Sequence, residues 1–217
     1  MRSRVAVTLL TSWIGAAVLR AQIPASGSLL VLAKSDQTLS IVDPMTLKVL
    51  GHAPSGPDPH EVVASTDGQF AYIANYNGGG NMISVVDLAA MKALPAIDLG
   101  PLRAPHGLVF VGGKLWFTAE GAKVIGSYDP ALKKVDWVLG TGQNRTHMIF
   151  VFDDLKRLVT SNVSSATMTI IEKSAGGGRQ GGPQGDWDET VIPVGRGAEG
   201  FDVSPDVLEV PSFLRDS

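Results

Sequence analysis

The chain has 217 residues, of which 44% are hydrophobic and 18% are charged, and its formal net charge is −3. This composition excludes a disordered chain, because enough apolar side chains are present to form a large core. It offers no overall positive charge that would attract nucleic acid, so no nucleic-acid partner is expected. The absence of cysteine excludes disulfides, thiolate metal sites and cysteine nucleophiles.

The first 21 residues have the features of a secretory signal peptide. Arg2 and Arg4 precede an apolar stretch from Val5 to Leu19, and Ala21 is a suitable last residue before cleavage. A membrane anchor is the alternative, but this stretch is short for a span of about 20 residues. We therefore predict a signal peptide over 1–21, no stable membrane span after its cleavage, and a periplasmic or secreted mature protein.

From residue 22 to residue 206 one sequence pattern recurs. His60, His106 and His147 each open a short apolar phrase, and Glu199 stands at the same position in a fourth copy. The copies are 46, 41 and 52 residues apart (106 − 60, 147 − 106 and 199 − 147). A period of about 40–50 residues with many short strands is typical of a β-propeller, in which each repeat forms one four-stranded blade. The repeat predicts an all-β protein of antiparallel blades, with about four blades present.

Each blade is predicted to run outward from the channel in four consecutive strands, which alternate apolar residues with turn signals such as Asp67-Gly68. The first blade lacks the innermost strand, and its outer strand is expected near 48–52. An aspartate ends each of the first three third strands and is expected to cap the following turn. The predicted strands are 28–33, 38–43, 48–52, 60–65, 70–75, 82–88, 92–99, 106–111, 115–119, 123–129, 134–139, 147–152, 157–162, 167–172 and 190–194.

Two segments depart from the pattern. Residues 174–188 are rich in glycine and are expected to form a mobile surface loop; in the alternative, Trp187 of this segment serves as a lid or contact residue. Residues 207–217 match no strand of the repeat and are expected to be an atypical tail. A truncated or frame-shifted reading frame would explain this tail. Alternatively, Gly200–Ser204 would pair with the incomplete first blade and close a four-bladed ring.

Residues Ser65–Asn75 and Gly200–Asp206 resemble the bacterial YVTN-type repeat, which is found in YncE-like exported proteins. The resemblance covers residues 28–206 and implies a propeller that normally has seven blades and serves as a binding platform. Pro-His and Ser-Pro-Asp phrases are also similar to those of the seven-bladed lactonase family. The first resemblance implies a scaffold, and the second implies an enzyme.

The repeat phase predicts one cluster of polar side chains at the mouth of the channel. Counting from the turns places His60 near Asn75, His106 near Glu120, and His147 near Ser161-Asn162. Arg103 and Arg145 would lie beside two of the histidines. The candidate ligand-binding residues are His60, His106, His147, Glu199, Asn75, Glu120 and Arg145.

Three interpretations of this rim remain open. The histidines would bond backbone carbonyls and serve the fold alone, or they would contact a small ligand, or they would bind a metal. A metal is disfavoured because neighbouring blades diverge around a wide channel. The string Gly195–Gly200 matches a dinucleotide-binding motif but precedes a strand, so no cofactor is predicted.

The sequence therefore favours a non-enzymatic scaffold that binds an unknown protein or small molecule at the channel mouth. The alternative is a lactonase-like hydrolase in which a histidine and a carboxylate of the rim activate water. The sequence assigns no residue a catalytic role.

Overall fold

The computed structural model describes residues 27–174, 187–204 and 212–214, and all regular elements of this part of the chain are β-strands. The strands pair antiparallel in three four-stranded sheets, one three-stranded sheet and one two-stranded sheet. In chain order they are β1 (Leu29–Ala33), β2 (Thr38–Val42), β3 (Val49–Pro54), β4 (Pro59–Ala64), β5 (Phe70–Asn75), β6 (Met82–Asp87), β7 (Lys92–Asp98), β8 (Pro105–Val111), β9 (Lys114–Ala119), β10 (Val124–Asp129), β11 (Lys134–Gly140), β12 (Thr146–Val151), β13 (Arg157–Asn162), β14 (Thr167–Lys173), β15 (Trp187–Pro193), β16 (Ala198–Phe201) and β17 (Ser212–Leu214).

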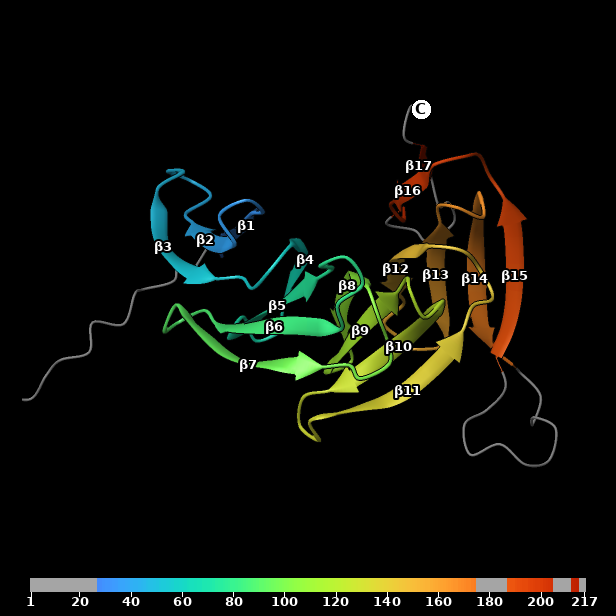
Figure 1. Cartoon of the computed structure of the whole chain (residues 1–217), viewed down its shortest axis with the longest axis horizontal. Coiled ribbons are helices and arrows are strands. Elements are labelled where there is room, and N and C mark those ends of the chain that lie inside the picture. The colour runs from blue at the N-terminus through green and yellow to red at the C-terminus, as the bar shows by residue number, and fades with distance from the viewer. Residues whose placement is uncertain (1–26, 175–186, 205–211, 215–217) are drawn as a thin grey trace, which may run out of the picture.

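Each sheet is built from consecutive strands, and we number these sheets as blades. Blade 1 is β1–β3, blade 2 is β4–β7, blade 3 is β8–β11, blade 4 is β12–β15, and β16–β17 form a fifth, partial sheet. Figure 1 shows the blades side by side along an arc, from blade 1 in blue to the partial sheet in red. The first strands of neighbouring blades contact one another, β4 with β8, β8 with β12, and β12 with β16. These inner strands line the centre of the arc.

Three apolar cores lie between successive blades. Leu39 and Ile41 of blade 1 pack with Ile73 of blade 2, and Tyr72 of blade 2 packs with Phe117 of blade 3. Between blades 3 and 4, Trp116 packs with Leu158. Because strands alternate their side chains between the two faces, each central blade contributes to two cores. The blades are therefore held together face to face, by apolar burial.

The strands confirm most of the predicted boundaries, including the missing first strand of blade 1. β5 and β13 begin and end where predicted, and the other strands of the prediction shift by at most three residues. The predicted turn caps are also confirmed. Asp43 accepts hydrogen bonds from the backbone N–H groups of Met45 and Thr46, and Asp87 and Asp129 cap their turns in the same way.

Two expectations are corrected, and a short strand is found in the segment predicted to be a tail. Trp187 belongs to β15, where it pairs with Lys173, because its indole packs into the core between blades 3 and 4. The predicted tail contains β17, which pairs with β16, since an inner strand without a neighbour offers a free edge. Among the described strands β16 pairs with β17 and not with blade 1, so the alternative of a closed four-bladed ring is wrong. The signal peptide over 1–21 and the loop residues 175–186 lie outside the described residues.

Candidate functional site

A β-bulge sits at the start of each inner strand and orients the rim residues. The register shifts between Pro59 and Val62, the same shift recurs in β8 and β12, and β16 has a shorter shift between Ala198 and Gly200 in its pairing with β17. His60, His106, His147 and Glu199 all fall inside these bulges. A bulge breaks the strict alternation of side chains and can turn a residue toward a site. The repeated bulge is therefore the local reason why one residue per blade reaches the rim.

The residue two positions before each rim residue has a left-handed backbone. The φ angles are 48° at Asp58, 57° at Ala104, 56° at Arg145 and 76° at Gly197. A non-glycine residue with φ in this region carries backbone strain. In blades 2 and 4 the strained residue is charged, and its side chain binds residues of the rim.

The structure brings the three histidines together, as the repeat phase predicted. The ring centroids of His60 and His106 lie 5.0 Å apart, and those of His106 and His147 lie 3.7 Å apart. Tyr76 packs against both His60 and His106, at centroid distances of 5.0 and 5.8 Å. The imidazoles of three successive blades thus form one continuous aromatic stack.

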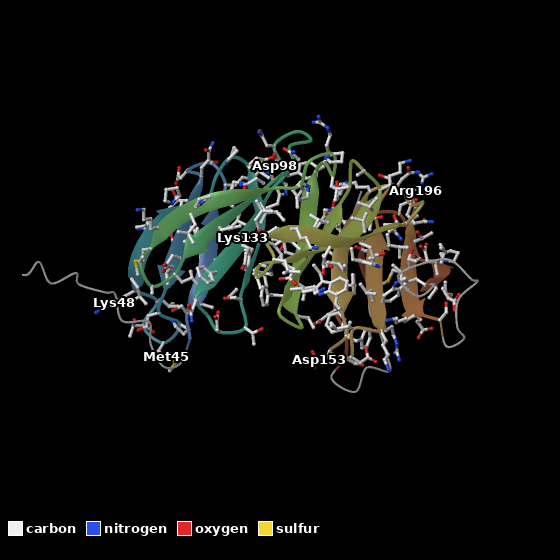
Figure 2. All side chains as sticks on the ribbon, turned by 90° about the horizontal axis from the view of Figure 1, so that it is seen from below. Met45, Lys48, Asp98, Lys133, Asp153 and Arg196 are labelled. Carbon is white, nitrogen blue, oxygen red and sulfur yellow. The ribbon has the colours of Figure 1, made fainter. Side chains whose placement is uncertain are left out.

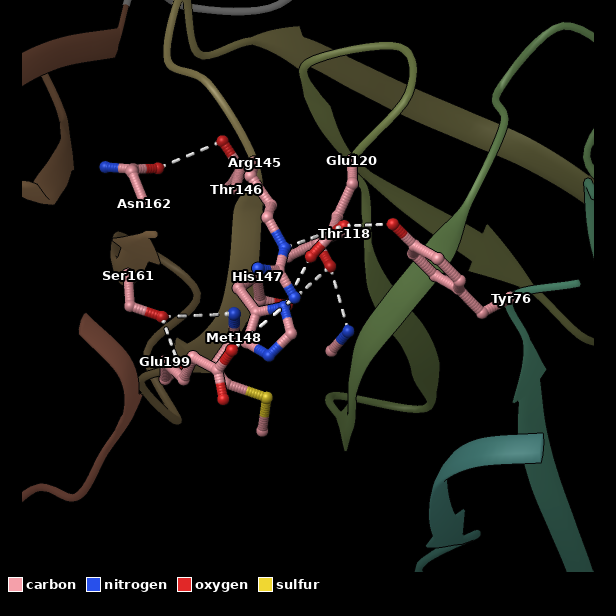
Figure 3. A network of polar contacts seen from close by, with 11 residues as sticks. Tyr76, Thr118, Glu120, Arg145, Thr146, His147, Met148, Ser161, Asn162 and Glu199 are labelled. Atoms are coloured by element: carbon pink, nitrogen blue, oxygen red, sulfur yellow. Dashed lines mark hydrogen bonds and ion pairs between the residues drawn. The ribbon is translucent and has the colours of Figure 1, made fainter. Parts of the chain in front are cut away.

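Glu120 is the centre of the polar network at one end of this stack (Figure 3). One carboxylate oxygen accepts a hydrogen bond of 2.7 Å from the Tyr76 hydroxyl and lies 3.5 Å from Nε of Arg145. The other carboxylate oxygen of Glu120 contacts Nδ1 of His147. Nη2 of Arg145 also lies 3.5 Å from the carboxylate of Glu199. Blades 2, 3 and 4 and the partial sheet thereby contribute to one buried carboxylate and its partners.

The opposite end of the stack is built around Lys34, which the repeated histidine pattern does not indicate. Its Nζ lies 2.7 Å from Nε2 of His60 and 2.9 Å from a carboxylate oxygen of Asp58. The same oxygen of Asp58 lies 3.3 Å from Nε2 of His60. This end of the rim is therefore an ion pair between Lys34 and Asp58, and the Lys34 ammonium also donates a hydrogen bond to the His60 imidazole.

Contacts of the rim also run between blades, in addition to the neighbours predicted within each blade. The residue that follows the second strand of one blade meets the histidine of the next blade. Lys34 contacts His60 and Glu120 contacts His147, while Tyr76 packs against both His106 and the His60 of its own blade. Lys34 and Tyr76 share the sequence phase of Glu120, which is the signal that could have identified them.

Two other predicted neighbours do not belong to the network. Asn75 is buried and binds the backbone carbonyls of Ser55 and Pro57, while its side-chain oxygen accepts from Ser84. It therefore fixes the chain that enters β4 and has a structural role. Arg103 donates a hydrogen bond to the carbonyl of Gly79 and takes no part in the histidine stack.

A hydroxyl on the second strand links the bulges of adjacent blades. Thr118 accepts a hydrogen bond of 2.8 Å from the N–H of Gly107 and donates one of 2.7 Å to the carbonyl of His147. In the next blade Ser161 bonds the N–H of Met148 and the carbonyl of Glu199 in the same way. These hydroxyls satisfy backbone groups that the bulges leave unpaired, and they hold consecutive rim residues in register.

Burial keeps the central histidine neutral. Burial, with the neighbouring His147 adding to it, lowers the pKa of His106 to about 3. Burial also lowers the pKa of His60, and the ammonium of Lys34 adds to this effect. Burial would raise the pKa of Glu120, but the hydrogen bonds from His147 and Tyr76 outweigh it and hold that pKa below its usual value. The centre of the rim thus combines neutral imidazole with ionised carboxylate.

This electrostatic arrangement predicts a stability that falls in acid. His106 stays neutral in the folded protein but takes up a proton in the unfolded chain below pH 6.5, so the unfolded state binds more protons between pH 6.5 and about 3. On going from pH 7 to pH 5, wild type should lose about 2 kcal/mol more unfolding free energy than the His106→Phe variant, at about 1.4 kcal/mol per pKa unit. Urea unfolding at both pH values measures this difference, and parallel losses in the two proteins would contradict the assignment.

A pocket of about 400 Å³ opens beside the Glu120 network. Tyr76, Glu120, Arg145 and Ala104 line it, together with glycines of two loops. Among the described residues, no three His, Asp or Glu side chains are arranged so as to hold a metal ion. The chemistry on offer is therefore hydrogen bonding by neutral imidazoles, a phenol hydroxyl, a guanidinium and carboxylates.

Comparisons with known proteins identify the fold. No protein-family model matches the sequence, and the search of curated proteins finds no match. Among solved structures, hydrazine synthase from Kuenenia stuttgartiensis matches with a TM-score of 0.68 and 19% identity, over 92% of this chain and 58% of that one. A functionally unknown protein from Desulfotomaculum acetoxidans matches with a TM-score of 0.66 and 15% identity, over 90% of this chain and 62% of that one.

A proposed 6-phosphogluconolactonase from Bacteroides uniformis matches with a TM-score of 0.67 and 16% identity, over 87% of this chain and 61% of that one. The chain has the β-propeller fold. It spans about three fifths of the length of each of these structures, with shares of 58%, 62% and 61%. At these identities the likeness shows the fold and leaves function to the site itself. In the described part of the chain, no helix could cross a membrane.

Proposed function

We propose that this protein is an exported, YncE-like propeller scaffold that binds a small polar ligand at the histidine rim. The observation that carries the proposal is the state of His106. Its side chain is buried and neutral, yet its Nδ1 has no hydrogen-bond partner among the described residues. A buried polar atom without a partner costs about 1–3 kcal/mol, so folding alone gives no reason for a histidine here.

The surroundings of His106 suit a hydrogen-bonding ligand. The imidazoles on either side are held by Lys34 and Glu120, so the stack is oriented before any ligand arrives. A preorganised site avoids the entropy cost of ordering its side chains upon binding. Export and a periplasmic or secreted location belong to the proposal, and they rest on the sequence features of residues 1–21.

The experiment compares His106→Phe with wild type. Phenylalanine keeps a buried ring but removes the unpaired nitrogen, so the unfolding free energy should stay equal or rise by about 1 kcal/mol. Thermal shifts are recorded with a panel of small carboxylic acids, sugars and amines. We expect at least one compound to raise the Tm of wild type and not that of the variant. Destabilisation of the variant by more than 2 kcal/mol, with no compound shifting wild type, would show that the histidine is structural.

A second candidate function is hydrolysis of a lactone, which the contact between Glu120 and His147 favours. The carboxylate holds Nδ1 of His147, while Nε2 makes no hydrogen bond within the described residues. Nε2 would accept a proton from water as the water oxygen attacks the lactone carbonyl, and the proton would pass to the ring oxygen as its bond to the carbonyl carbon breaks. A pH-stat assay with δ-gluconolactone tests this. If the protein hydrolyses the lactone above the spontaneous rate, and this activity falls at least tenfold in Glu120→Gln, the protein is an enzyme.

A further inference from the structure

The hairpin turns at the end of the blades opposite to the histidine rim differ in length. Blades 2 and 4 have four-residue turns, closed by backbone hydrogen bonds from Ser65 to Phe70 and from Phe152 to Arg157. In blade 3 Val111 pairs with Lys114, so only two glycines form the turn. The turn of blade 3 therefore lacks two residues that both neighbouring blades possess.

In blade 4 the longer turn reaches back onto blade 3. Leu155 lies against Gly112, where an added Cβ would come within 2.7 Å of a Leu155 methyl group. Leu155 also packs against the core between the blades, together with Trp187, whose ring centroid lies 5.3 Å from that of Trp137. A branched aliphatic side chain and an indole of blade 4 thus close the crevice between blades 3 and 4.

The crevice between blades 2 and 3 has neither of these side chains. The two-residue turn of blade 3 has no counterpart of Leu155. Lys133 stands where blade 4 has Trp187. Lys133 directly precedes Lys134, which pairs with Asp129, and Trp187 directly precedes Asp188, which pairs with the equivalent residue Glu172. Leu94 occupies the position of Trp137, as the pairing of Val85 with Leu94 and of Ser127 with Trp137 shows.

An open groove results at this junction. Two pockets of about 400 and 550 Å³ share Phe70, Tyr72 and Pro130 and together reach from the glycine turn of blade 3 to Leu94 and Lys133. We call this the inter-blade groove. Lys133 lies near the middle of Figure 2, where the sheets of blades 2 and 3 meet. No ion pair of the described residues involves Lys133, so its ammonium is available at the outer end of the groove.

We propose that the inter-blade groove binds a peptide segment that carries a branched aliphatic side chain, an aromatic side chain and an adjacent carboxylate. The first two would take the places that Leu155 and Trp187 fill one blade further on, and the carboxylate would pair with Lys133. The filled crevice between blades 3 and 4 thus indicates which side chains fit the inter-blade groove. The groove lies at the end of the blades opposite to the histidine rim, so this inference goes beyond the proposed function and does not depend on it.

The test uses the peptide acetyl-Leu-Ser-Trp-Asp-amide and follows the amide NMR signals of Gly112 and Gly113 during a titration. Saturable shifts of these signals are expected, as for weak peptide recognition in apolar grooves. Replacing the peptide's leucine by serine, or its aspartate by lysine, should weaken binding at least fivefold. Equal binding of all three peptides, or no shift at millimolar peptide, would overturn the proposal.

Two variants fill the groove from within the chain. In the first, Gly112-Gly113 is replaced by the Asp-Asp-Leu-Lys turn of blade 4. The second variant, Leu94→Trp, places an indole at the position equivalent to Trp137, and it is used if the variant with the longer turn does not fold. Either folded variant should weaken peptide binding at least tenfold. Unchanged affinity in a folded groove-filling variant would refute the assignment of the groove.

Discussion

The His147→Phe variant is expected to unfold at a free energy about 3 kcal/mol below that of wild type. The substitution keeps a ring in the stack but removes the nitrogen that contacts Glu120. The side chain of Glu120 is only 4% exposed, so its carboxylate cannot turn to solvent for a replacement partner. Removing one partner of a buried charged pair typically costs about 3–5 kcal/mol, and Tyr76 and Arg145 retain part of the stabilisation. Urea unfolding at pH 7 measures the loss.

Two comparisons make this result specific. Glu120→Gln combined with His147→Phe should cost clearly less than the sum of the single variants, because Glu120→Gln removes the buried charge whose partner His147→Phe takes away. His106→Phe, the matched change at the neighbouring buried histidine, should show no such loss. Additive losses, or equal losses at the two histidines, would mean that the contact between Glu120 and His147 does not stabilise the fold.

The Gly107→Ala variant is expected to lose about 3 kcal/mol and to disturb the histidine stack. A Cβ at this position would lie 2.5 Å from the carbonyl oxygen of His147 and 2.8 Å from Cα of Met148. Both atoms belong to the backbone of β12, so β8 and β12 must move apart. Overpacking of this kind typically costs about 1–3 kcal/mol, and the displaced Thr118 hydroxyl adds to that cost.

The matched control is Gly140→Ala. Gly140 also lies on a strand, but nothing stands within 4 Å of an added Cβ there. The unfolding free energy of Gly140→Ala should stay within about 0.5 kcal/mol of that of wild type. Thermal unfolding of both variants, with the ring signals of His106 followed by NMR, separates the two sites. Equal stability of Gly107→Ala and wild type would show that β8 and β12 do not pack as closely as described.

The sequence could predict the strands and the gathering of the histidines because both depend on local patterns. The turn residues and the alternation of apolar side chains set the strand boundaries, and the repeat phase fixes which residue of each blade faces the rim. His60, His106 and His147 were therefore identified correctly as neighbours. The aspartate caps followed from the same local reasoning.

The partners of the histidines could not be predicted by counting within a blade. The contact of Glu120 with His147 depends on the offset between adjacent sheets, and no turn inside a blade encodes this offset. The bulges add to the difficulty, because they shift the register where the rim begins. Trp187 was assigned to a loop since glycines precede it, whereas apolar packing against Trp137 holds it in β15. Tertiary packing thus overrode the local signal.

Two repeated sequence positions determine the chemistry of the rim. One position lies in the bulge of an inner strand, where a histidine recurs, and the other lies just beyond a second strand of the preceding blade. Lys34, Tyr76, Glu120 and Val163 occupy this second position and share no chemistry. Since the residue there belongs to no ladder, it can change from cation to phenol to carboxylate without disturbing strand pairing. A propeller of this kind can change the chemistry of its rim one blade at a time, while the pairing of its strands stays the same.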